Sequence, residues 1–308
     1  MVTTTEGNAN LVKTLCAICE TDIYDEVMYP SNFDAGSLSY DVFSARRLPD
    51  RCHYRIVRCQ KCGLVRSNPI ADEKTLEVLY QGSHFTYERE SVFASETYAS
   101  YLEKALAYIG HGIRLLEIGC GNGAFFKKVQ LLGVKNFFGI EPSQEAVENA
   151  GEFKSRIHRG MFGPKIYPEN HFDLICAFQV FDHIASPNEF LQDCRKYLNR
   201  NGIVLFINHD IGSPLAKLFK ESNPIIDIGH TFLYDKRTLR KILEKNNFEV
   251  LDVFNVVNRY PLSYWVKIMP VAKFIKNSLL KGLTLLKLER IPLRLSVGNV
   301  GIIARIIN

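Results

Sequence analysis

The sequence predicts an α/β fold with a mostly parallel sheet, preceded by a small cysteine-rich module. Three observations lead to this prediction. From residue 113 onward, short apolar runs alternate with amphipathic segments, as strands and helices do in a parallel sheet covered on both faces. A glycine-rich stretch at residues 119–123 follows the first of these runs. Two C-x-x-C pairs precede residue 70, where short β-like runs occur without a long helical period.

Length and composition are those of an ordinary globular protein. The chain has 308 residues, of which 46% are hydrophobic and 23% charged, and this excludes global disorder, collagen-like repeats and a coiled coil. The net charge of +5 is too small to indicate nucleic-acid binding by itself. No apolar run reaches the ~18 residues of a membrane span, and the first residues lack the apolar core of a secretory signal. We therefore expect a cytoplasmic protein whose eight cysteines are thiols or metal ligands rather than disulfides.

The sequence pattern divides the chain into three regions: a module over residues 1–70, a helical linker or cap over 71–110, and an α/β domain over 111–308. In the linker, one helix begins at Ala71 or Asp72 and a second covers Ser91–Ile109. The α/β domain is expected to contain two insertions, at residues 209–234 and 266–294, and an antiparallel last strand. Its expected elements are, in order, strand 113–118, helix 124–132, strand 136–140, helix 144–150, a short strand at 157, strand 172–178, helix 188–198, strand 203–207, helix 236–245, strand 248–257 and strand 300–307.

The most informative stretch is the run Leu115-Leu116-Glu117-Ile118-Gly119-Cys120-Gly121-Asn122-Gly123. It reads as a buried strand that enters alternate glycines and then a helix. Glycines let the backbone turn sharply and approach a ligand closely, and the first N–H groups of a helix lack intrahelical partners. Glu141 ends the next strand, where an open α/β sheet places a carboxylate that accepts the two ribose hydroxyls of a nucleoside cofactor.

This loop is compatible with two cofactors. Gly119, Gly121 and Ala124 satisfy the dinucleotide pattern G-x-G-x-x-G/A, so a nicotinamide enzyme is one interpretation. Glu117 favours the other interpretation, because its carboxylate can help to bind the ammonium group of a methionine-type cofactor, directly or through water. A pyrophosphate would gain nothing from that carboxylate.

At this point the sequence resembles the class I S-adenosylmethionine-dependent methyltransferases. The resemblance covers residues 111–308 and includes Phe172-Asp173-Leu174-Ile175, the following Val180-Phe181-Asp182-His183-Ile184, and the approach to the fifth strand at residues 198–204. It implies S-adenosylmethionine as cofactor. After the third strand, residues 158–162 lack the acidic residue that many members of the family use for the adenine. The implied cofactor-binding residues are Glu117, Gly119, Cys120, Gly121, Gly123, Glu141, Pro142, Met161, Phe178 and Gln179.

The two cysteine pairs, Cys16 with Cys19 and Cys59 with Cys62, predict a metal site. Gly63 permits the tight turn of a zinc knuckle, and four thiolates make a closed tetrahedral site that is structural rather than catalytic. The 39 residues between the pairs include Cys52 and His53, and either could replace one of the four cysteines as a metal ligand. Accidental pairs and a thioredoxin-like redox pair are the other interpretations.

The knuckle and the residues after it resemble the N-terminal module of the sugar-nucleotide C-methyltransferases. That module contains C-x-x-C-G-L-x-x-x-x-P, matched here by residues 59–69, and then an aromatic-rich helical stretch, matched by Tyr80, Phe85 and Tyr87. Ribosomal-RNA methyltransferases with zinc modules have more closely spaced ligands. The resemblance therefore implies a small acceptor such as a sugar nucleotide or another glycan precursor, and no specific nucleic acid. An RNA methyltransferase and a non-catalytic zinc-ribbon interaction protein are the alternatives.

Methyl transfer to a hydroxyl or carbon acid needs alignment and a base. In the sugar C-methyltransferases, a histidine in an E-H-x-x-Y-like segment after the fifth strand is the base. His230 and Tyr234 resemble that histidine and tyrosine, although Gly229 replaces the acid and the tyrosine lies one residue further on. His183, after the fourth strand, is the other candidate base. His209, after the fifth strand, ranks below both.

The basic residues are concentrated in one segment. Residues 266–294 have a net charge of +6, whereas the rest of the chain sums to −1. Leucines recur among these lysines at helical spacing. The segment could be a solvated helix, a helix at the surface of an anionic membrane, or a lid whose lysines approach a pyrophosphate of the acceptor. We favour the lid, because the segment joins two strands of the predicted sheet. Nothing in the sequence indicates the oligomeric state.

Overall fold

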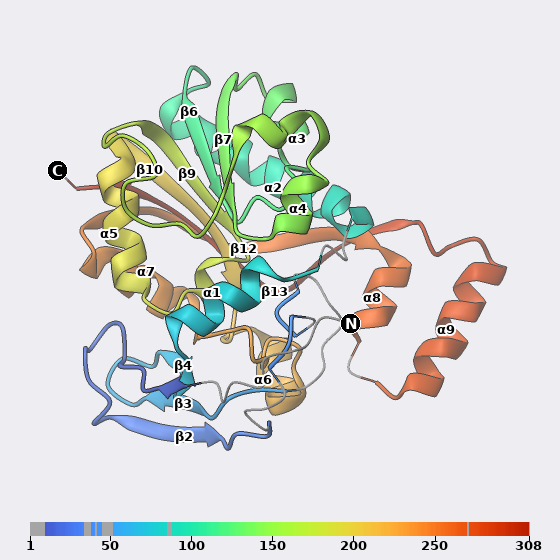
Figure 1. Ribbon diagram of the computed structural model, residues 1–308. Helices are drawn as coiled ribbons and strands as arrows, with labels where there is room; N and C mark the ends of the chain where they lie inside the picture. The colour runs from blue at the N-terminus through green and yellow to red at the C-terminus, as the bar shows by residue number, and fades with distance from the viewer. Residues whose placement is uncertain are drawn as a thin grey trace, which may run out of the picture.

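The computed structural model describes residues 10–33, 38–40, 42–44, 52–84, 88–269 and 271–307. Its centre is a seven-stranded sheet with the strand order β12-β13-β10-β9-β6-β7-β8 (Figure 1). Five neighbouring strands of the sheet, β8, β7, β6, β9 and β10, pair in parallel. β13 runs antiparallel to both of its neighbours, β10 and β12. The predicted fold class is therefore confirmed. The strands are β6 (Arg114–Ile118), β7 (Asn136–Glu141), β8 (Ile157–Arg159), β9 (Phe172–Phe178), β10 (Leu198–His209), β12 (Phe248–Pro261) and β13 (Pro292–Ile306).

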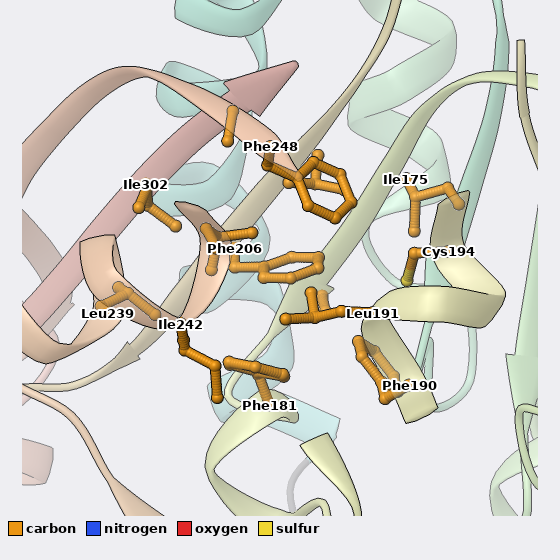
Figure 2. Close-up of a cluster of buried hydrophobic side chains, with 14 of the residues drawn as sticks. Ile175, Phe181, Phe190, Leu191, Cys194, Phe206, Leu239, Ile242, Phe248 and Ile302 are labelled. Carbon is orange, nitrogen blue, oxygen red and sulfur yellow. The ribbon is translucent and has the colours of Figure 1, made fainter. Parts of the chain in front are cut away.

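Helices cover both faces of this sheet because successive strand residues point to opposite sides. Leu115 packs in the core with α2 (Glu88–Ile109), α3 (Phe126–Leu131) and α4 (Gln144–Glu148), whereas Leu116 belongs to the core beneath α5 (Pro187–Tyr197) and α7 (Lys236–Lys245). Figure 2 shows this second core, in which side chains of the two helices meet those of β9, β10, β12 and β13. Its labelled residues are Ile175, Phe181, Phe190, Leu191, Cys194, Phe206, Leu239, Ile242, Phe248 and Ile302.

The largest difference from the expected elements concerns the last two strands. β12 continues to Pro261 and β13 begins at Pro292, and their pairing extends to these two prolines. The hairpin therefore projects beyond the sheet as a two-stranded ribbon. The connection between the strands is correspondingly shorter than expected and contains α8 (Leu262–Ile268) and α9 (Lys273–Leu285). Residues 292–294, expected to be the end of the insertion, instead begin β13.

The N-terminal region forms a second, smaller sheet with the order β11-β4-β3-β2. Three of its strands are β2 (Asp25–Tyr29), β3 (Ile56–Cys59) and β4 (Val65–Ser67). The fourth, β11 (Phe232–Leu233), comes from the segment after β10, and it pairs antiparallel with β4. A long-range strand pair thus joins the cysteine-rich region to the α/β domain.

The remaining elements complete the frame around this small sheet. β1 (Leu11–Val12) pairs with β5 (Ile70–Ala71), and α1 (Glu73–Gln81) begins directly after β5 with Asp72 as its N-cap. α6 (Pro214–Phe219) lies in the segment after β10. None of the helices in the described part of the chain is long and apolar enough to cross a membrane.

Candidate active site

A cavity of about 930 Å³ lies at the carboxyl ends of β6, β7, β9 and β10. Ligands bind at this edge in open α/β sheets, because the loops that leave neighbouring strands diverge there. The glycine loop after β6 and Glu141 at the end of β7 line one part of the cavity. Histidines after β9 and β10 line another part, and residues of α1 and α8 complete the wall.

The glycine loop requires its glycines for backbone geometry and for space. Gly119 has a φ of 70°, and a Cβ there would lie 2.5 Å from Cγ2 of Val180. Glu141 is held against the loop, because its Oε2 accepts a hydrogen bond of 2.8 Å from the amide of Gly121 and its Oε1 accepts one of 2.9 Å from the amide of Ser143. Burial raises the pKa of Glu141, and these two hydrogen bonds oppose the rise.

Most residues predicted to bind the cofactor lie together. Gly123 does not line the cavity: its φ is 71°, and a Cβ there would lie 3.0 Å from the ring of Phe126, so it serves the packing of the loop on α3. The amide oxygen of Gln179 is buried and has no hydrogen-bond partner among the described residues, which fits an added donor such as the ammonium group of S-adenosylmethionine. The predicted residues that line the cavity are Glu117, Gly119, Cys120, Gly121, Glu141, Pro142, Met161, Phe178 and Gln179.

Three histidines surround the buried carboxylate of Asp182. His209 Nδ1 lies 2.6 Å from Asp182 Oδ2, His230 Nε2 lies 4.0 Å from the same oxygen, and His183 Nε2 lies 3.9 Å from Oδ1. The ring of His230 is between the other two, with centroid distances of 4.6 Å to each. Asp182 is fully buried, and all three histidines line the cavity. From the sequence, Asp182 had no assigned role, and His209 ranked below the other two histidines as a candidate base.

The environment keeps these groups in different charge states. Burial alone would raise the pKa of Asp182, but the charge of His209 and its hydrogen bond, with smaller contributions from His183 and His230, hold it below the ordinary value. Burial lowers the pKa of His183 to about 4. Burial also lowers the pKa of His230, and the nearby charge of His209 lowers it further. His230 is therefore neutral at neutral pH.

The tautomer of neutral His230 follows from its hydrogen bond. Nδ1 lies 2.8 Å from the carbonyl oxygen of Ile225, which can only accept, so Nδ1 carries the proton. Nε2 then has a lone pair that can take a proton from another group. An imidazolium formed in this way would lie 4.0 Å from the Asp182 carboxylate, which would stabilise it.

The tyrosine beside the histidines is Tyr80 rather than Tyr234. The Tyr80 hydroxyl lies 3.2 Å from His183 Nδ1, and Tyr80 lines the cavity. Tyr234 is fully buried, stacks on Phe181 with a centroid distance of 5.0 Å, and is not among the cavity residues. The structure therefore gives no support to the predicted catalytic role of Tyr234. The other two aromatic residues of the predicted stretch, Phe85 and Tyr87, lie outside the described residues.

The small N-terminal sheet positions the backbone that carries His230. The Ser67 hydroxyl donates to the carbonyl oxygen of His230 at 2.8 Å, and the Ser67 amide donates to the carbonyl oxygen of Thr231 at 2.9 Å. The Thr231 amide in turn donates to the carbonyl oxygen of Asp182 at 2.9 Å. Ser67 ends β4 and lies five residues after Cys62, so β4 connects the cysteine cluster to the backbone that carries His230.

The four predicted metal ligands converge. The Sγ atoms of Cys16, Cys19, Cys59 and Cys62 all lie within 4.8 Å of one another. Two of the distances are 3.4 Å, between Cys16 and Cys62, and 3.9 Å, between Cys19 and Cys59. Zn–S bonds of about 2.3 Å in a tetrahedron place sulfurs about 3.8 Å apart, so the set fits such an ion. Cys52 and His53 do not belong to the cluster; His53 instead contacts Tyr54 O and Glu221.

Comparisons with known proteins place most of the α/β region in a known domain family. Residues 89–253 match the Methyltransferase domain family. The ubiquinone biosynthesis O-methyltransferase of Bradyrhizobium diazoefficiens is 30% identical over 99 residues, 30% of this chain and 39% of that protein. The Pelagibacter ubique protein of the same name is 26% identical over 192 residues, 54% of this chain and 75% of that protein. The human mitochondrial one is 29% identical over 171 residues, 50% of this chain and 46% of that protein.

The solved structures are more distant. The YcgJ protein of Bacillus subtilis has a TM-score of 0.49 at 16% identity, covering 68% of this chain and 99% of that one. A SAM-dependent methyltransferase of Archaeoglobus fulgidus has a TM-score of 0.46 at 18% identity, covering 76% of this chain and all of the other, 100%.

The chain belongs to the Methyltransferase domain family, since the match covers more than half of it. Residues 89–253 therefore form a methyltransferase domain. Matches to the first curated relatives span only about two fifths of their length, 39% for the Bradyrhizobium protein. The acceptor of those proteins therefore does not transfer to this chain by similarity alone.

Cofactor binding should depend on the Glu141 carboxylate. Glu141→Ala removes the acceptor for the ribose hydroxyls and also frees the Gly121 amide, so S-adenosylhomocysteine affinity should fall by about tenfold or more, since each hydrogen bond to a charged group contributes about 1.5–3 kcal/mol. Isothermal titration calorimetry measures this change. Glu145→Ala, at an exposed carboxylate on the adjoining helix, is the control. Equal affinity of Glu141→Ala and wild type would refute the assignment.

Proposed function

We propose that this methyltransferase modifies a hydroxyl or an acidic carbon of a small acceptor, and that His230 is the general base. The observation that carries the proposal is the fixed tautomer of His230, whose Nδ1 is bonded to the Ile225 carbonyl oxygen while Nε2 keeps its lone pair beside Asp182. A neutral imidazole with a buried carboxylate nearby can accept a proton and then have its new charge stabilised.

S-adenosylmethionine, when bound, supplies an electrophilic methyl group on a sulfonium. The glycine loop and Glu141 would hold this cofactor, which would give its methyl group to the acceptor oxygen or carbon and be left as a neutral thioether. The acceptor proton passes to Nε2 of His230. Asp182 offsets the resulting imidazolium charge, and the hydrogen bond from His209 Nδ1 orients that carboxylate. Tyr80 and His183 contact each other at the same wall and can align the acceptor.

We favour a sugar nucleotide or related glycan precursor as acceptor. The support is the cysteine module, whose C-x-x-C-G-L-x-x-x-x-P pattern resembles that of sugar-nucleotide C-methyltransferases, together with polar side chains such as Asn223 and Asp227 near the histidines in the cavity wall. Hydroxyl-rich ligands need such convergent polar partners.

A phenolic acceptor is the second candidate, because a different part of the cavity wall favours it. Tyr260, Tyr264 and Trp265 line the cavity and contact one another, with ring-centroid distances of 4.4–6.1 Å. Aromatic walls of this kind bind flat apolar groups. The names of the curated relatives, ubiquinone biosynthesis O-methyltransferases, are consistent with such an acceptor.

We also propose that the four cysteines hold one structural zinc ion. Four thiolates leave no coordination position for water or substrate, so the ion would stabilise the fold and would not take part in methyl transfer. The amides of Cys19 and Leu64 approach the Sγ atoms of Cys16 and Cys62 at 3.4 and 3.5 Å, and such contacts orient thiolates on a metal.

A panel of acceptors distinguishes the two candidate substrate classes. The purified chain and labelled cofactor are incubated with nucleotide sugars, with catechols and with RNA, and products are identified by mass spectrometry. Methylated nucleotide sugar supports the first proposal, and methylated catechol alone would replace it with the second. Methylated RNA, with binding that weakens steeply as salt increases, would contradict both.

Replacement of the base should slow turnover without affecting the cofactor. His230→Asn should lower kcat by about 10²–10⁴-fold while S-adenosylhomocysteine affinity stays unchanged. His183→Asn and His209→Asn are measured in parallel. A variant of His230 with wild-type kcat would disprove its role, and a larger loss in His209→Asn would transfer the role to the histidine bonded to Asp182.

The rate should depend on pH with a defined sign. The base must be neutral, so kcat/KM should rise with pH through the pKa of His230. Burial lowers that pKa, and the midpoint should therefore lie below the ordinary histidine value of about 6.5. A pH–rate profile from acid to neutral pH checks this. A midpoint above that value would mean that His230 is not the titrating base.

Metal loss should impair the acceptor half of the site more than the cofactor half. Elemental analysis should find about one zinc per chain, and none in Cys16→Ser/Cys59→Ser. Because β4 links the cluster to the His230 backbone, this variant should lose turnover but still bind S-adenosylhomocysteine. Cys52→Ser is the matched control and should keep its zinc. Full zinc content in the double variant would exclude the site.

A further inference from the structure

The connection between β12 and β13 contains two helices with different environments. α8 contributes Tyr264, Trp265 and Ile268 to the cavity wall, and the Trp265 Nε1 donates to the carbonyl oxygen of Leu293 at 3.1 Å. α9 has no buried residue, and Figure 1 shows it at the right-hand edge of the molecule, beyond α8. The expected lid of lysines is not seen, because no lysine of the described part of residues 266–294 lines the cavity, and the aromatic wall residues Tyr264 and Trp265 precede that segment.

α9 exposes several large apolar side chains. Phe274 is 72% exposed and Leu285 84% exposed, which are large values for such side chains. Ile275 and Leu279 are also exposed and, four residues apart, lie on one side of α9; Leu286, the C-cap residue of the helix, is exposed next to them. A contiguous apolar surface of this kind normally marks an interaction site.

The charges around these apolar side chains have one sign. Residues 266–294 contain seven basic side chains and one acidic one, Glu289. Lys273 and Lys281 are exposed on α9, and Lys276 donates to the carbonyl oxygen of Lys267 at 2.9 Å. Exposed apolar side chains bordered by lysines are the features of a helix that lies in the interface of a membrane rather than across it.

We propose that α9 docks this protein on an anionic lipid bilayer, with Phe274, Ile275, Leu279, Leu285 and Leu286 in the headgroup and acyl boundary and the basic side chains against lipid phosphates. Charge complementarity selects this partner: a second copy of the chain would bring another surface of the same sign against this one, whereas anionic headgroups neutralise it. The proposal does not depend on the identity of the methyl acceptor.

If α9 lies in the membrane interface, the aromatic wall of the cavity would be near the bilayer. Met269, 40% exposed, and Val271 lie between α8 and α9 and also line the cavity. The apolar surface is therefore continuous from the cavity wall to the foot of α9. An acceptor carried at the membrane surface could reach the site from this side.

Vesicle co-sedimentation of the full chain tests the proposal. The chain should sediment with phosphatidylglycerol-containing vesicles, sediment poorly with pure phosphatidylcholine vesicles, and dissociate as salt is raised. Ile275→Ser/Leu279→Ser/Leu286→Ser should abolish sedimentation, whereas Leu131→Ser, at a leucine that is 79% exposed on α3, should not. Lys273→Gln/Lys281→Gln should weaken association about fivefold for each lysine removed, and Lys127→Gln/Lys135→Gln is its charge-matched control.

S-adenosylhomocysteine binding by each variant shows that the catalytic domain remains folded. Failure of the wild-type chain to sediment with anionic vesicles would overturn the proposal, as would equal binding by the lysine variant and its control. Gel filtration distinguishes membrane docking from self-association of the chain. If the serine variants convert a dimer to a monomer and vesicles bind neither form, the apolar surface of α9 is an interface between copies of this chain and the proposal fails.

Discussion

The acceptor half of the active site depends on one buried charge, the carboxylate of Asp182. Burial of an ion without partners is strongly unfavourable, and here the partners are the ring of His209 at 2.6 Å and the more distant rings of His183 and His230. The backbone of Asp182 is held as well, since its carbonyl oxygen accepts from both the amide and the hydroxyl of Thr231. One residue therefore ties together the ends of β9 and β10 and the loop that carries His230.

The cysteine-rich region is an integral part of this arrangement. β4 continues from the second cysteine pair into Ser67, which bonds the backbone of both His230 and Thr231. Cys16, Cys59 and Cys62 also lie in the same apolar core as Phe181, Phe232 and Tyr234. Tyr234 thus has a structural position between the cysteine cluster and the site, which accounts for its complete burial. A metal that rigidifies the cluster would stabilise the loop of the proposed base through these contacts.

The two ends of the cavity have different chemical properties, and this difference separates their roles. At the glycine loop, a buried carboxylate and backbone amides are arranged for a nucleoside and an amino-acid group, and the positive φ values of Gly119 and Gly121 are needed there. At the other end, titratable rings face aromatic side chains from α8 and the β12–β13 ribbon. The ribbon extends beyond the sheet and carries α8 and α9 outward, so the same hairpin that closes the cavity also supports the exposed apolar helix.

Local patterns were sufficient to predict the elements of the sheet, the glycine loop and the two cysteine pairs. Strand periodicity, glycines at fixed spacing and C-x-x-C pairs are properties of short segments, so they are visible in a single sequence. The continuation of β12 and β13 to their prolines was missed because two-stranded ribbons are weakly patterned. No role could be predicted for Asp182, because an isolated acidic residue has no local sequence signature.

The sequence by itself determined the fold class, the glycine loop that lines the cavity and the four thiols that converge. Only the tertiary structure decided that Asp182 and His209 meet, that Tyr80 rather than Tyr234 stands beside His183, and that β11 completes the small sheet. The physical reason is that these contacts join residues 27 to 168 positions apart in the sequence. Their distances depend on the order of strands in the sheet and on the path of the segment after β10, and neither is encoded in a local period.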